Sequence, residues 1–184
     1  MGWILLIAGV LLWTAAHLFK RLAPARRAAM GDAGKGMIAL AIGASIVLMV
    51  IGYRATPFVN VWAPPAFMVH INNLLILIAI YMMSPAPRRG ALLSGMRHPM
   101  LAGFKAWAVA HLLVNGDLAS IILFGGLFAW AVIEVIAINR AEAQWTPRPK
   151  GSLVMDGAFL LASVVLMVII GYIHGWLGYW PFPS

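Results

Sequence analysis

Residues 1–35 read MGWILLIAGVLLWTAAHLFKRLAPARRAAMGDAGK, an uncharged apolar run followed by a basic segment. The basic segment holds five cationic residues: Lys20, Arg21, Arg26, Arg27 and Lys35. An apolar helix of about 20 residues is long enough to cross the hydrocarbon of a bilayer. The positive charge follows the apolar run, whereas in a cleaved signal peptide it precedes it. We therefore expect a retained membrane span with the N-terminus outside and the basic segment in the cytoplasm.

The alternation of apolar runs and basic clusters continues along the chain. The remaining clusters are Arg88, Arg89 and Arg97, and then Arg140, Arg148 and Lys150. Loops on the cytoplasmic side of membrane proteins are enriched in Lys and Arg, so this pattern predicts that both termini are periplasmic. A set of aromatic residues then falls at the outer interface, where Trp and Tyr are common: Trp3, Tyr53, Trp62, Tyr172, Trp176, Tyr179 and Trp180.

The apolar runs predict about six transmembrane helices, at 2–19, 36–54, 66–83, 99–115, 118–139 and 155–175. Backbone polar groups inside lipid must be satisfied within the protein, and no run alternates as the strand of a barrel does. The predicted fold is thus an all-α, polytopic helical bundle forming a single domain, 1–184. Only Asn115-Gly116-Asp117 separates the fourth and fifth spans, which predicts a tight antiparallel hairpin. Glycines within two spans are expected to allow close helix packing: Gly43, Gly52, Gly125 and Gly126.

The composition excludes several classes of protein. The chain is 63% hydrophobic and 10% charged, with a mean hydropathy of +0.93, which is outside the range of soluble domains. The net charge is +8, but no basic helix or basic-aromatic strand indicates nucleic acid, so we expect the charge to face anionic lipid headgroups of the bilayer. The absence of cysteine excludes disulfides, thiolate metal sites and iron–sulfur clusters.

Ionisable residues inside the spans are costly and are candidates for function. When depth is counted in residues from the basic clusters, Lys105 and Glu134 lie roughly 10 Å inside the cytoplasmic edge of the membrane. His17 lies closer to that edge. One interpretation is an ion pair between Lys105 and Glu134 on adjacent helices. The other is that Lys105 faces an anionic group, such as a propionate of a cofactor.

His70 and His111 form a second layer, nearer the outer side. Trp107 and Asn115 share a helix face with His111. Two histidines at matched depth on different helices either bind a heme iron or make hydrogen bonds between helices. His98 is expected to be solvated at the start of a cytoplasmic helix.

The stretch RHPMLAGFKAWAVAHLLVNGDLASIILFGG, residues 97–126, resembles the NnrU family of bacterial membrane proteins. His17 before a basic loop and a span ending in Gly52-Tyr53 are similar to that family too. The family is named for its association with nitrite and nitric oxide reduction. The resemblance implies a multi-pass protein of the bacterial inner membrane, associated with denitrification and with redox or nitrogen-oxide reductase partners.

The same stretch is similar to the plant 15-cis-zeta-carotene isomerases, which carry heme b. This resemblance implies that His111 is one axial ligand and His17 the other, whereas depth alone pairs His111 with His70. Both pairings stay open. The isomerases have a cysteine three residues before the ligand histidine, where this chain has Ala108.

RHPMLAG also resembles the RHPxYxG motif of membrane methyltransferases that use S-adenosylmethionine. That resemblance implies a site with Arg97, His98, Arg140 and Glu142, although Leu101 replaces the tyrosine of the motif. The alternatives to a heme protein associated with denitrification are therefore an isomerase-like enzyme, a methyltransferase and a non-catalytic membrane assembly protein. Catalytic and non-catalytic roles both stay open.

Overall fold

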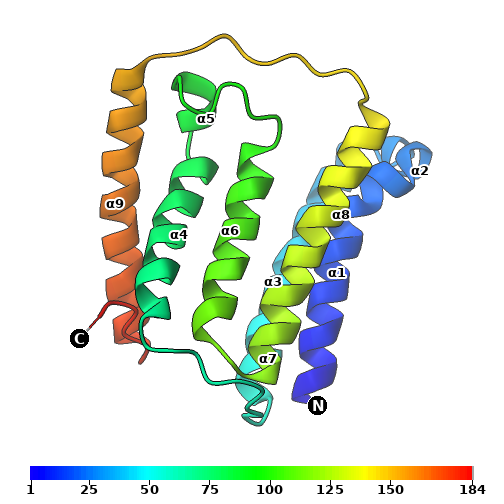
Figure 1. Ribbon diagram of the computed structural model, residues 1–184. Helices are drawn as coiled ribbons and strands as arrows, with labels where there is room; N and C mark the ends of the chain where they lie inside the picture. The colour runs from blue at the N-terminus through cyan, green and yellow to red at the C-terminus, as the bar shows by residue number, and fades with distance from the viewer. Residues whose placement is uncertain (184) are drawn as a thin grey trace. The chain divides into compact units, whose positions relative to one another are not determined.

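The computed structural model describes residues 1–183, which form helices joined by short connections (Figure 1). The elements are α1 (Gly2–Leu22), α2 (Pro24–Ala29), α3 (Ala33–Ala55), α4 (Met68–Met83), α5 (Ala86–Arg89), α6 (Pro99–Val114), α7 (Leu118–Ser120), the π-helical turn η1 (Ile121–Gly125), α8 (Gly126–Ala141) and α9 (Leu153–Trp176). No β-sheet occurs within this range, so the predicted all-α membrane fold is confirmed.

The predicted spans all appear as apolar helices, but they differ in length. Within residues 1–183, four helices are long and apolar enough to cross a membrane: α1, α3, the continuous helix Leu118–Ala141 and α9. Helices α4 and α6 have 16 residues each. At 1.5 Å per residue they are about 24 Å long, shorter than the roughly 30 Å of hydrocarbon in a bilayer. The fifth span also contains the π-helical turn η1, which the sequence analysis did not predict.

The helices group into two compact units, whereas the sequence predicted a single domain. Segments of the two units alternate along the chain. The first unit contains Met1–Ala63 and Asn115–Ala143, and the second contains Pro64–Val114 and the chain from Gln144 onwards. The boundary at Asn115 divides the predicted hairpin between them. Each unit therefore draws its helices from separate parts of the sequence.

In the first unit, α1 packs antiparallel to α3 along most of its length (Figure 1). Near the middle, Gly9 of α1 lies against Met49 of α3, and at the end Gly52 of α3 lies against the backbone of Leu6. A side chain at either glycine would collide with the neighbouring helix. The missing Cβ atoms therefore set the short distance between these two helices.

Helix α8 also packs on α1, and it runs parallel to it. Gly126 of α8 lies against Val10 of α1, so the packing role predicted for Gly52 and Gly126 is confirmed. The same prediction was wrong for Gly43 and Gly125, because a Cβ at either position would meet nothing within 4 Å. The sequence shows where a glycine occurs, but it does not show which face of the helix contacts a neighbouring helix.

The Asn-Gly-Asp segment caps the fifth span. Asp117 accepts hydrogen bonds from the backbone N–H of Ser120 (2.9 Å) and from its hydroxyl (2.6 Å). The hydroxyl of Ser120 also lies 2.8 Å from the Tyr53 hydroxyl of α3. Asp117 thus satisfies a free N–H at the helix start and helps to tie α3 to that end.

In the second unit, α4 packs antiparallel to α6 and also contacts α9 (Figure 1). Gly103 of α6 lies against Ala79 and Met82 of α4. Nearer the other end, the Asn72 amide donates to the carbonyl of Ala110 (3.0 Å) in the orientation that satisfies both of its groups. These contacts fix the register between the two short helices.

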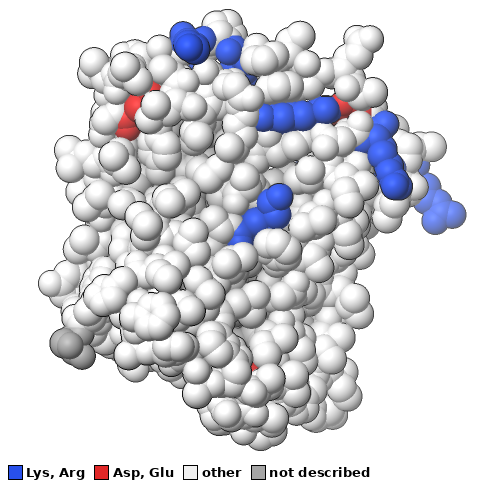
Figure 2. Space-filling model, in the orientation of Figure 1, with Lys and Arg blue, Asp and Glu red and all other residues white. Residues whose placement is uncertain are grey.

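Each unit has a basic end, as predicted from the sequence. In the first unit, cations lie at the end of α1, in α2, near the start of α3 and at the end of α8. In the second unit, they lie in α5 and just before α6 and α9. Figure 2 shows that the Lys and Arg side chains of the visible face gather mainly near helix ends. At the far end of α9, Tyr172, Trp176 and Tyr179 are 64%, 86% and 75% exposed. This separation of charge and aromatic residues fits helices that cross a bilayer.

Candidate functional site

The ring of His17 is held between two tryptophans. Its Nδ1 lies 2.9 Å from the carbonyl oxygen of Trp13, one turn earlier in α1. The ring centroid is 4.2 Å from that of Trp13 and 4.6 Å from that of Trp130 of α8. A hydrogen bond to a carbonyl requires the proton on Nδ1, which leaves the lone pair of Nε2 for another partner.

One carboxylate of α8 lies near His17. Glu134 lies one turn after Trp130, within electrostatic range of His17 and Arg21. One carboxylate oxygen of Glu134, Oε2, is buried and has no hydrogen-bond partner among the described residues. Because a buried oxygen without a partner costs free energy, Glu134 retains bonding capacity that the described residues do not use.

The ring of His111 is held by its own helix in the same way. Its Nδ1 lies 2.9 Å from the carbonyl oxygen of Trp107, and the two ring centroids are 4.8 Å apart. Ala108 and Ala110 on either side of this turn are fully buried. The hydrogen bond from Asn72 to Ala110 ties the backbone beside His111 to α4.

His17 and His111 therefore share a local motif, Trp-x-x-Ala-His, which the sequence analysis did not recognise. The signal was present in the spacing, since residues four apart meet on one face of a helix. His174 makes the same backbone bond, from Nδ1 to the carbonyl of Ile170 (2.8 Å), but it is exposed and has no tryptophan one turn before it. A ring whose orientation is fixed by a hydrogen bond from one nitrogen is usual for a metal-binding histidine.

His70 lies at the start of α4, where its side chain is exposed. It lines a cavity of about 510 Å³ together with Phe67 and Phe182. The antiparallel register of Asn72 and Ala110 brings His70 and His111 to the same end of the second unit. This agrees with the equal depth inferred from the sequence. The choice of His17 or His70 as partner of His111 stays a prediction.

The other residues predicted for the site fall in both units. Lys105 is half-buried in α6 of the second unit, whereas Glu134 belongs to the first, and their ion pair stays a prediction. Glu142, which the methyltransferase resemblance placed with Arg97, pairs with Arg21 at 2.8 Å. The carboxylate of Glu142 is therefore already engaged within the first unit.

The Arg97-His98-Pro99 motif begins α6. The carbonyl of His98 accepts the N–H of Ala102 at 2.9 Å, so His98 stands at the helix start as predicted. Arg97 and His98 are both half-buried, and so is Asn115, which follows the other end of α6. The motif and Asn115 thus mark the two ends of the helix that carries His111.

Asp156 is a buried polar residue that the sequence analysis missed. Only 4% exposed, it accepts the hydroxyl of Tyr81 (2.6 Å) and the backbone N–H groups of Ala91 (2.6 Å) and Leu92 (3.2 Å). These bonds join α9 to α4 and to the connection that leads into the Arg97 motif. The available signal was a carboxylate in the first turn of the last apolar run.

The fold and these side chains define a helical membrane protein with two histidines, each backed by a tryptophan. The family profile described as NnrU protein matches residues 5–181, and the chain belongs to the NnrU family. No curated protein and no solved structure matches the chain. The family match confirms the resemblance seen in the sequence.

Proposed function

We propose that this protein binds heme b, with His111 as one axial ligand of the iron. The observation that carries this proposal is the shared geometry of His111 and His17. In both, the ring stands one helical turn after a tryptophan, and a hydrogen bond from Nδ1 to the carbonyl of that tryptophan fixes its orientation. The porphyrin supplies four nitrogens to the iron, so the protein has to add only one or two histidines.

The surrounding residues support such a role by orienting the rings and excluding water. Trp107 and the buried Ala108 lie beside His111, and Trp13 and Trp130 enclose the ring of His17. Bound heme supplies one-electron transfer or the binding of small diatomic molecules. In the proposal, Lys105 neutralises a propionate of the cofactor.

Family membership and the membrane helices support a proposal for the cellular setting. We place the protein in the bacterial inner membrane, with its basic helix ends in the cytoplasm, where it takes part in nitrite or nitric oxide reduction. Its partner there is a redox protein or a nitrogen-oxide reductase. Membership of the NnrU family supports this setting.

A reduced-minus-oxidised absorption spectrum of the purified protein tests the proposal. We expect a Soret band that shifts on reduction, and its loss in His111→Ala. Measured side by side, His17→Ala and His70→Ala identify the second ligand, because only the ligand's removal changes the coordination of the iron. His174→Ala is the matched control, since His174 makes the same backbone bond but is exposed.

Two results contradict the proposal. One is a protein that contains no heme when it is expressed in cells able to make it. The other is an unchanged spectrum in His111→Ala. If a colourless protein instead bound labelled S-adenosylmethionine and lost it in His98→Ala, the methyltransferase interpretation would replace this one.

A further inference from the structure

A cleft lined by basic residues lies where α1 ends and α3 begins. It is away from the contacts that Gly9 and Gly52 make between these two helices. Its volume is about 330 Å³. Three cations line it, Lys20 of α1, Arg27 of α2 and Lys35 of α3, together with apolar Ala16, Ile38 and Ile42. Cationic and apolar groups thus share one concave surface within the first unit.

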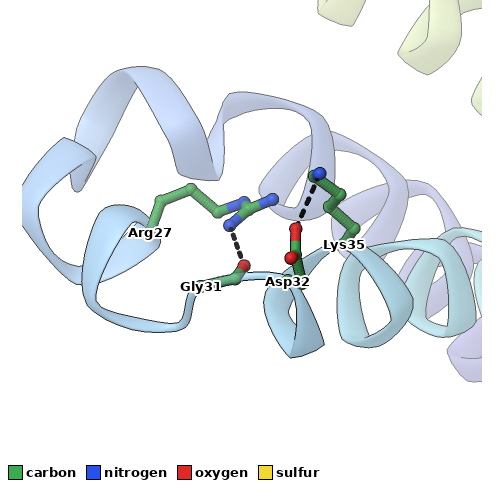
Figure 3. A network of polar contacts seen from close by, with 4 residues as sticks. All are labelled: Arg27, Gly31, Asp32 and Lys35. Atoms are coloured by element: carbon green, nitrogen blue, oxygen red, sulfur yellow. Dashed lines mark hydrogen bonds and ion pairs between the residues drawn. The ribbon is translucent and has the colours of Figure 1, made fainter.

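The short helix α2 and the turn after it place Arg27 in this cleft. Pro24 begins α2, and Gly31 follows it with φ of 53°, a left-handed conformation that suits glycine. The guanidinium of Arg27 donates from Nη1 to the carbonyl of Gly31 (3.2 Å), as Figure 3 shows. Gly34 leaves room for this group, since a Cβ there would come within 2.8 Å of Nη1. The position of Arg27 is therefore set by the backbone.

The three cations outnumber the acidic groups beside them. Lys35 pairs with Asp32 at 2.8 Å (Figure 3), but their side chains are 75% and 94% exposed. Such an exposed pair contributes little free energy, so Lys35 can exchange its partner. The bond from Arg27 to Gly31 uses one of five guanidinium N–H donors. The cleft retains positive charge and free donors for an anionic group.

The apolar side of the cleft lies on one face of α3. Ile38 and Ile42, one turn apart on that face, line the cleft and are only half-buried. Exposed apolar residues on a membrane helix face acyl chains. A ligand of the cleft therefore meets cations at one end and a lipid-facing surface at the other.

We propose that this cleft binds one anionic phospholipid. Its phosphate lies among Lys20, Arg27 and Lys35, and its acyl chain follows Ile38 and Ile42 along α3. Basic pockets between membrane helices on the cytoplasmic side are known to hold anionic headgroups. His17 forms part of the wall, but the lipid site needs no heme and does not rest on the proposed function.

Native mass spectrometry of the full-length protein tests this proposal. The protein is purified from nanodiscs containing cardiolipin, phosphatidylglycerol or phosphatidylcholine, and the lipid that stays bound is counted. We expect one retained anionic lipid and no retained phosphatidylcholine. Each of Lys20→Gln, Arg27→Gln and Lys35→Gln should weaken retention roughly fivefold, as expected for one cation near a headgroup.

A matched variant distinguishes lipid binding in this cleft from attraction of lipid by the net charge of the protein. Arg26, Arg88 and Arg89 are exposed and do not line the cleft. Changing all three to Gln removes the same charge as changing Lys20, Arg27 and Lys35, and it should leave the retained lipid in place. The proposal also requires that millimolar inorganic phosphate does not displace the lipid, because the acyl chain contributes to binding.

Three outcomes overturn the proposal. Equal loss of lipid in the two triple variants would show attraction by net charge alone. Full displacement by inorganic phosphate would indicate a phosphate site without a lipid chain. Loss of heme rather than lipid in Lys20→Gln, Arg27→Gln and Lys35→Gln would assign the cations to a cofactor carboxylate.

Discussion

His17 in the first unit and His111 in the second have the same local geometry but different support. His17 stacks on Trp130, which comes from another helix, in addition to the tryptophan of its own turn. His111 lies on a helix whose backbone is tied to α4 by Asn72, beside fully buried alanines. The same five-residue motif thus has a ring contact from another helix in the first unit and a side-chain hydrogen bond to its backbone in the second.

The two units differ more broadly in how their helices are joined. In the first, glycines and aromatic rings bring helices together along their length. In the second, a buried carboxylate at one end connects α9, α4 and the connection before α6. Both units have glycine contacts and polar ties, but the ring contacts around Trp130 lie in the first unit and the carboxylate that joins three segments lies in the second. Substitutions can therefore test each separately.

The largest effect is expected from Trp130→Ala. Trp130 is 5% exposed and contacts the rings of Trp13 and His17. Its removal should lower the free energy of unfolding by about 3–5 kcal/mol, as for other buried aromatic residues. Unfolding in detergent measures the loss, and hydrogen exchange should show it in the first unit. Trp145→Ala, at a position 38% exposed, is the control; equal losses in the two variants would contradict the importance of the ring contacts.

Asp156→Ala should have the next largest effect. It leaves the hydroxyl of Tyr81 and the N–H groups of Ala91 and Leu92 without their acceptor. Loss of these bonds should cost about 3 kcal/mol and speed hydrogen exchange at Ala91 and Leu92. Asp32→Ala removes a carboxylate whose side chain is 94% exposed and should cost little. If exchange at Ala91 and Leu92 stayed slow, Asp156 would not be the centre that joins these segments.

Gly52→Ala is expected to have a smaller effect, confined to the first unit. The added methyl would meet the backbone of Leu6, so α1 and α3 would have to move apart. We expect a loss of about 1–3 kcal/mol in the free energy of unfolding. Gly43→Ala in the same helix meets nothing within 4 Å and should be neutral or slightly stabilising. Equal behaviour of the two variants would show that the glycine contact does not set the packing of α1 on α3.

Much of the fold was predictable because hydropathy and charge act locally. Each apolar run becomes a helix since its backbone must be satisfied within the segment in lipid. The basic clusters fall at helix ends, as predicted, and the ends of the helices differ from the predicted spans by a few residues. The family could also be predicted from the sequence, because the residues that resemble it, Arg97 to Gly126, form one continuous stretch.

The candidate site was predictable only in part. His17, His70 and His111 stand out in sequence as ionisable residues in apolar runs, and the bonds from His17 and His111 to their tryptophans follow from helical spacing. The contact of His17 with Trp130 joins residues 113 positions apart in the numbering, and that of Tyr81 with Asp156 joins residues 75 apart. Nothing in either local sequence identifies the partner.

By itself, then, the sequence determined the helices, their basic ends and the family of this protein. Only the tertiary structure decided that α1 meets α3 and α8, that Gly52 but not Gly43 lies at a contact, and that Asp156 joins three segments. The physical reason is that transfer into lipid favours every apolar face alike. Which faces meet depends on close packing and hydrogen bonds between residues distant in sequence.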